Sequence, residues 1–215
     1  MFPFVEQRLA RTPVGAGAAI IVIAAAAWLV TARAPDTMGM GAWPFLGTWT
    51  AMMTAMMLPS AAPLLLLYRR GSGAVDTAAL GLGYLLVWGA LGYAAYAYLV
   101  WGPMLPTWSV LAVAGIYQLT PLKGSCLRRC RTPADFLVRR YGRAPLLLGL
   151  EHGLWCAGCC WALMFILVVV GSMSLAWAAG IAAVVLVEKV APSGDRLARI
   201  GGIVLVVLAL VEGVF

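Results

Sequence analysis

Residues 145–170 read PLLLGLEHGLWCAGCCWALMFILVVV, an apolar segment that carries a glutamate, a histidine and three cysteines near its middle. A bilayer-crossing helix needs about 20 mostly apolar residues, and this segment is long enough. Charged and metal-binding side chains are costly in hydrocarbon, so their presence inside such a helix indicates a functional site. The segment therefore predicts both a membrane helix and a site within it.

The rest of the chain has the composition of a membrane protein. Of 215 residues, 63% are hydrophobic and 11% charged, and a soluble chain of this size could not cover so much apolar surface. We predict an all-α, polytopic membrane helix bundle that forms one integral-membrane domain over residues 1–215. Seven transmembrane helices are expected, near 14–32, 43–67, 78–101, 108–122, 145–170, 173–187 and 200–215.

Basic residues set the expected orientation. The net charge is +7, and the basic residues lie between apolar runs, where they determine topology rather than bind nucleic acid. Threading the seven spans from a cytoplasmic N-terminus leaves only Arg33 outside, so the C-terminus is expected outside. The chain then lies in a bacterial inner (plasma) membrane as a multi-pass protein. Arg8 and Arg11 before the first span would also fit a cleaved signal peptide. However, the apolar region of this span is longer than the 7–15 residues usual in signal peptides.

A basic cytoplasmic loop is expected over residues 123–144. Within it, Thr132, Pro133 and Asp135 have the pattern of an N-cap, first position and third position of a short helix. That helix would lie in the membrane interface, with the lipid bilayer as its partner.

The helical repeat places four metal-binding residues on one face of the fifth span. With His152 at 0°, Cys156 falls at ~40°, Cys159 at about −20° and Cys160 at ~80° at 100° per residue. Buried cysteines also occur as small apolar residues, and a lone histidine also occurs as an ordinary core residue. Four of them on one face favour a metal site.

Other sulfur residues flank this face. Met52 and Met56 lie one helical turn apart in the second span, above Pro59 and Pro63, although methionines at helical spacing also occur as core packing. Cys126 and Cys130 form an i, i+4 pair beside arginines at the inner surface.

Ligand softness selects the metal. Thioether and thiolate ligands favour Cu(I) first, while zinc or another soft metal is compatible with imidazole and thiolate together. One thiolate with neutral partners around Cu(I) is electrically neutral, whereas four thiolates around zinc carry about −2, which is costly in hydrocarbon.

Three blocks of the sequence carry a resemblance: MMTAMMLPS from residue 52, YQLTPLKGSCLRRCRTP from residue 117, and GLWCAGCCWALM from residue 153. Together they resemble an uncharacterised bacterial family of predicted metal-binding integral membrane proteins. The resemblance implies that Cys126, Cys130, Cys156, Cys159 and Cys160 matter for function.

The leading hypothesis is a membrane-embedded Cu(I)-binding protein that acts in metal transport, delivery or homeostasis. Its metal ligands are expected among His152, Cys156, Cys159, Cys160, Met52, Met56, Cys126 and Cys130, with Gln118 and Thr120 lining the cavity. A metallochaperone or another membrane subunit is the expected protein partner.

Two alternatives stay open: a membrane thiol-disulfide oxidoreductase, and a non-catalytic assembly subunit of a larger complex. No nucleotide-binding loop or paired catalytic carboxylates are present, which disfavours an enzyme that pumps or hydrolyses on its own.

Overall fold

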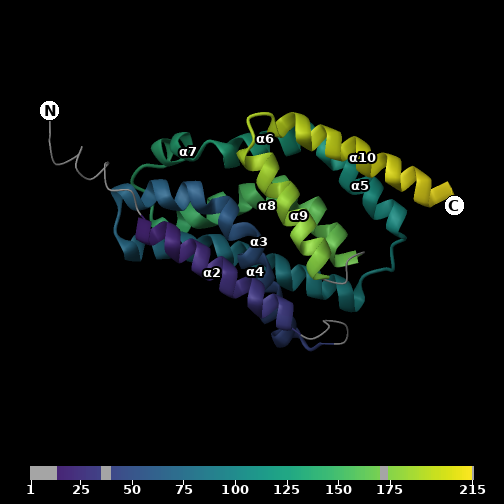
Figure 1. Cartoon of the computed structure of the whole chain (residues 1–215), viewed down its shortest axis with the longest axis horizontal. Coiled ribbons are helices and arrows are strands. Elements are labelled where there is room, and N and C mark those ends of the chain that lie inside the picture. Colours follow the sequence, from purple (N-terminus) through teal and green to yellow (C-terminus); the bar gives the residue numbers. More distant parts are fainter. Residues whose placement is uncertain (1–13, 35–39, 170–173, 215) are drawn as a thin grey trace.

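The chain folds as a bundle of helices (Figure 1). This computed structural model describes residues 14–34, 40–169 and 174–214, which contain helices and no strands. Arg8 and Arg11, which entered the argument on orientation, lie outside the described residues. The helices are α2 (Val14–Arg33), α3 (Ala42–Gly71), α4 (Ala74–Trp101), α5 (Thr107–Leu119), α6 (Pro121–Arg131), α7 (Pro133–Arg139), α8 (Pro145–Val169), α9 (Leu175–Val190) and α10 (Gly194–Val214). The all-α class is confirmed.

Five of the described helices are long and apolar enough to cross a membrane: α2, α3, α4, α8 and α10. A sixth crossing results if α5 and α6 count as one span broken by a bend of 65°. The remaining predicted span, the sixth at 173–187, corresponds to α9, which has only 16 residues. Membrane-like helices are therefore present, while the count of seven and the orientation stay predictions.

The region predicted as a basic loop is largely helical. Thr120 and Pro121 end α5 and start α6, because proline lacks the N–H that would continue α5 and the Thr120 hydroxyl caps the new helix at the Lys123 amide. Further along, α7 begins at Pro133 as expected, but the Thr132 hydroxyl donates to the Arg128 carbonyl instead of capping α7. Lys123, predicted to be a loop residue, is 1% exposed.

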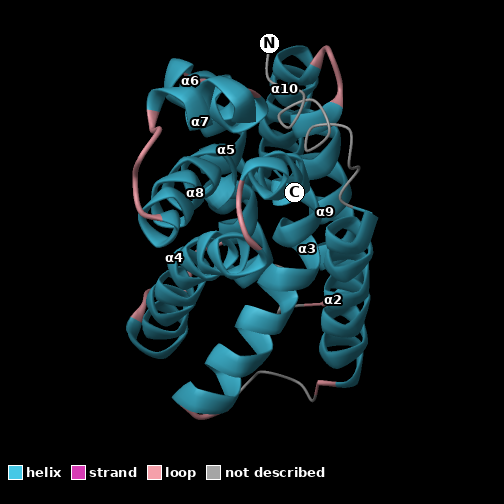
Figure 2. Cartoon of the chain, turned by 90° about the vertical axis from the view of Figure 1, so that its left-hand side faces the viewer, coloured by secondary structure: helices cyan, strands magenta, loops and turns pink. Residues whose placement is uncertain are grey.

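Helix α8 occupies the centre of the arrangement. It contacts α4, α5, α6 and α9, while α2 packs on α3 and α10 packs along α5. Figure 2 shows α6 and α7 together beside α8 at one end of the bundle. Helix α8, which carries three of the cysteines, is therefore enclosed by helices from both halves of the chain.

Close contact between α4 and α8 depends on glycines. A Cβ atom on Gly149 would lie 2.0 Å from the Leu80 carbonyl oxygen, and one on Gly83 would lie 2.2 Å from the Leu146 carbonyl oxygen. Small residues let two helix backbones approach closely in membranes, as they do here. The glycines thus set the depth at which α8 lies in the bundle.

Replacing Gly149 with alanine is expected to destabilise the protein, because the new methyl group would collide with backbone and force α4 and α8 apart. Overpacking of this kind costs about 1–3 kcal/mol, so the midpoint of thermal unfolding in detergent should fall by several degrees. Gly89→Ala is the control, since a Cβ there meets nothing within 4 Å. Equal unfolding midpoints for the two variants would contradict the glycine-dependent contact.

Candidate metal centre

Three buried thiols form a compact group on α8. The sulfur atoms of Cys156, Cys159 and Cys160 all lie within 4.8 Å of one another, and each residue is 1% exposed or less. Spacings of three and four residues put them on one helix face. The Cys159 and Cys160 thiols each donate to the Cys156 carbonyl at 3.0 Å. The thiol ladder predicted from the helical repeat is therefore present as a cluster.

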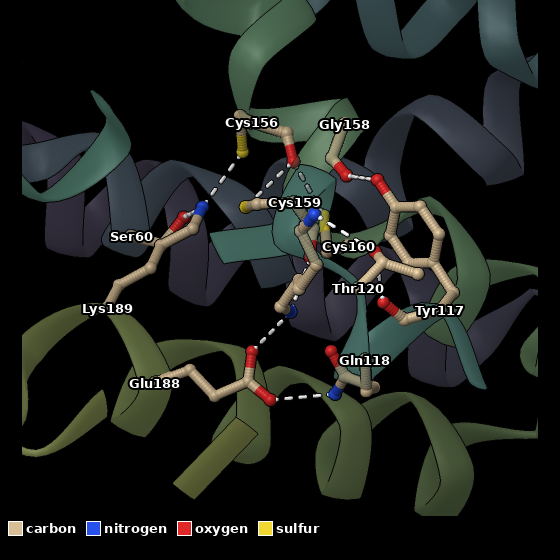
Figure 3. A network of polar contacts seen from close by, with 11 residues as sticks. Ser60, Tyr117, Gln118, Thr120, Cys156, Gly158, Cys159, Cys160, Glu188 and Lys189 are labelled. Carbon is tan, nitrogen blue, oxygen red and sulfur yellow. Dashed lines mark hydrogen bonds and ion pairs between the residues drawn. The ribbon is translucent and has the colours of Figure 1, made fainter. Parts of the chain in front are cut away.

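A lysine from α9 contacts this cluster. Lys189 Nζ lies 2.8 Å from Cys156 Sγ and 2.9 Å from Ser60 Oγ on α3 (Figure 3). The Tyr84 hydroxyl of α4 lies 3.0 Å from the same sulfur and also donates to the Met57 carbonyl at 3.2 Å. A buried ammonium beside a thiol stabilises the thiolate, which is the form that binds metals. Cys156 is thus the thiol best placed to act as an anionic ligand.

A second buried charge pair lies one residue away on α9. Glu188 accepts from Lys123 Nζ at 2.6 Å and from Gln118 Nε2 at 2.8 Å, and Lys123 and Glu188 are 1% and 2% exposed. Lys123 Nζ also donates to the Cys159 carbonyl. This network joins the start of α6 and the end of α5 to α8 and α9 beside the thiols (Figure 3).

The α6 cysteines lie against the same part of α8. Cys130 is close enough to interact with the thiols of Cys156 and Cys159. Cys126 packs over Gly158, where a Cβ atom would lie 2.9 Å from its sulfur. The Tyr117 hydroxyl donates to the Gly158 carbonyl, which secures α5 to α8 at this level. The sequence separated an inner-surface pair from a midplane cluster, whereas the structure gathers all five cysteines where α6 meets α8.

The other predicted ligands are buried nearby. His152 is 3% exposed, its ring packs against Tyr84 and Phe136, and its Nδ1 has no hydrogen-bond partner among the described atoms. It is not part of the compact thiol group. Met52 and Met56 are buried in the α3 core, and the contacts of α3 with the site run through Ser60 and the Met57 carbonyl.

Charged residues outside the cluster form a separate group. Glu151 accepts hydrogen bonds of 2.6–2.9 Å from Arg140 and one of 2.7 Å from Arg143. These hydrogen bonds raise the pKa of Arg140. Arg129 lies over the Trp155 ring with its central carbon 3.8 Å from the ring centroid.

Sequence reasoning missed Tyr84, Ser60, Glu188 and the role of two lysines. It assigned Lys123 and Lys189 to the cytoplasmic surface because positive charges commonly flank spans there, but both are buried. The sequence feature that could have predicted these buried charges is the adjacent Glu188 and Lys189 near the end of an apolar run. Charged side chains in such a position are stable only when they pair with other groups.

Comparison with known proteins identifies a family. No curated protein and no solved structure matches the chain. The model of a family described as "PpoB2: Copper chaperone" matches residues 46–212, which include every cysteine and the Glu188–Lys189 pair. Because this match covers more than half of the sequence, the chain belongs to the PpoB2 copper chaperone family.

Proposed function

We propose that this protein is a membrane-embedded copper chaperone that holds Cu(I) between the α8 thiols and passes it to a partner. The observation that carries the proposal is the cluster of Cys156, Cys159 and Cys160 with the Lys189 ammonium 2.8 Å from Cys156. Membership of the copper chaperone family supports the choice of metal. Copper is the cargo here, so binding must be tight but reversible.

Charge balance supports Cu(I) with two thiolates. Two thiolates around Cu(I) leave one negative charge, which the nearby Lys189 ammonium offsets. Lys123 and Glu188 already neutralise each other. A two-thiolate site, which the sequence alone did not favour, is therefore electrically neutral in this surrounding. Thiolates are soft ligands and select Cu(I) over harder ions.

Separate roles follow for the remaining sulfur atoms. We assign Cys156 and Cys159 as the primary ligands, because both lie close to Cys130 and Cys156 also contacts Lys189. Cys160 and Cys130 then serve as exchanging ligands during transfer. His152, Met52 and Met56 are buried in the core. A partner protein that receives copper would complete the transfer by ligand exchange.

We further propose that the protein lies in a bacterial inner membrane with its arginine-rich helices α6 and α7 on the cytoplasmic side. The apolar character of five to six helices supports membrane insertion. The positive-inside bias supports the orientation. Transport of copper across the membrane is a further role compatible with a central site.

Removing two thiols should abolish copper binding. The wild-type chain, purified anaerobically in detergent and loaded with Cu(I), should retain about one copper per chain in a soft sulfur site. The variant Cys156→Ser/Cys159→Ser should retain almost none, as measured by elemental analysis after removal of weakly bound metal with a Cu(I) chelator. Cys126→Ser is the matched control, because Cys126 packs on Gly158 outside the compact group. Equal copper content in the wild type and the double variant would overturn the site.

Removing the ammonium should weaken binding without removing a ligand. Lys189→Met leaves the two-thiolate complex with an uncompensated buried charge, so the Cu(I) affinity should fall by at least about tenfold. Lys189→Arg keeps the charge and should recover part of the affinity. Chelator competition at constant pH measures both variants. A Lys189→Met protein that binds Cu(I) as tightly as the wild type would exclude the charge-compensation role.

One observation keeps thiol redox chemistry as a second candidate. Three free thiols within 4.8 Å of one another are close enough to form a disulfide after oxidation. An oxidoreductase would exchange electrons with an external dithiol and would keep that activity without copper. Thiol labelling of the copper-free protein, before and after treatment with a disulfide-containing protein that can accept its electrons, distinguishes an oxidoreductase from a chaperone.

A further inference from the structure

A polar cavity of about 350 Å³ lies where α6, α7 and α8 meet, apart from the thiol cluster. Its lining includes Arg129, Asp135, Arg139, Arg140, Glu151 and Trp155. Three guanidinium groups face two carboxylates, so the lining carries one excess positive charge. Copper binding by the α8 thiols makes no use of these side chains.

Two of the arginines are paired with the carboxylates. Arg139 Nε donates to both Asp135 oxygens at 2.9 Å. Arg140 is held by Glu151 through Nε and one terminal nitrogen. A guanidinium has five N–H donors in a fixed plane. The partly buried Glu151 orients the Arg140 guanidinium, and both arginines keep further N–H groups for an anionic ligand.

Arg129 supplies the third positive group. Its central carbon lies over the Trp155 ring, 3.8 Å from the ring centroid, and it takes part in no salt bridge among the described residues. Stacking on an aromatic ring fixes a guanidinium without using its N–H donors. Arginines fixed in this way recognise phosphate through paired hydrogen bonds.

The surface beside the cavity is apolar. Val138 is 77% exposed and Tyr141 is 94% exposed, next to Arg139 and Arg140 on the same segment, and Leu154 on α8 is 64% exposed. Exposed apolar side chains beside fixed arginines are typical of a segment at the boundary between lipid headgroups and hydrocarbon. An occupant with an anionic group and an adjoining apolar chain fits both parts of this surface.

We propose that this cavity binds the phosphate of an anionic phospholipid, with its acyl chains lying beside the exposed apolar residues of α7 and α8. The inference rests on the membrane insertion proposed above and is independent of copper binding. Because Trp155 and Glu151 on α8 flank His152 and Cys156 in the sequence, a lipid in this cavity would secure α7 to the helix that carries the thiols.

The test is lipid binding by the purified full-length chain in detergent, with bound lipids counted by native mass spectrometry. Three probes are compared: phosphatidylglycerol, phosphatidylcholine and free glycerol 3-phosphate. The variant Arg129→Gln/Arg139→Gln removes two cavity charges, and Arg128→Gln/Arg196→Gln removes two exposed charges elsewhere. Copper content is measured on every sample to verify that the thiol site is intact.

Phosphatidylglycerol should bind more tightly than phosphatidylcholine, and the cavity variant should weaken its binding roughly 30-fold, since each basic group near a membrane surface contributes ~1 kcal/mol. The control variant should change it by no more than about twofold. Equal losses in both variants would mean diffuse charge attraction and overturn the site. Equally tight binding of phosphatidylcholine and phosphatidylglycerol would also overturn the site. If glycerol 3-phosphate binds as tightly as the lipid, the cavity is a site for soluble phosphates and not for a phospholipid. A wild-type protein that binds no copper but still prefers phosphatidylglycerol would count against the chaperone proposal and leave the lipid site standing.

Discussion

The contact between Lys189 and Cys156 is the interaction on which the site depends. An isolated ammonium in a protein interior is costly, and it is retained only where a partner compensates it. Here the partner is the thiol of Cys156, which forms a compact buried group with the thiols of Cys159 and Cys160. The adjacent residue, Glu188, compensates Lys123 in the same way. Two consecutive residues of α9 therefore connect with α8 and α6 through opposite charges, and neither pair is complete without α9.

These charge pairs also explain why a short helix belongs to the core. With 16 residues, α9 is the shortest of the helices assigned to the predicted spans apart from the broken α5. Its apolar side chains alone would distinguish few packing positions, because lipid is as apolar as a neighbouring helix. A carboxylate and an ammonium that must each reach a particular partner fix both its rotation and its height. The charges thus specify position in a place where apolar packing does so poorly.

Much of the site could be predicted from local sequence, and the rest could not. Helical periodicity correctly placed Cys156, Cys159 and Cys160 together, because three residues on one rigid helix need no knowledge of other helices. The same periodicity put His152 on that face, yet its ring packs with Tyr84 and Phe136 from other helices. The proximity of Cys130 to the cluster depends on the 65° bend at Thr120 and Pro121. Local spacing contains no information about such an angle. Likewise, Lys189 carries the same charge at a membrane surface and in a core, and only the tertiary fold distinguishes the two.

The break between α5 and α6 also has a mechanical consequence. Cys130 lies nine residues beyond Pro121, or about 14 Å along the helix at 1.5 Å per residue. If α6 turns about the break as a rigid arm, a rotation of about 10° displaces the Cys130 sulfur by roughly 2 Å at that radius. A metal–sulfur bond is about 2.3 Å long. If the protein holds copper as proposed, a swing of this size is enough to bring the Cys130 thiol to the ion or withdraw it.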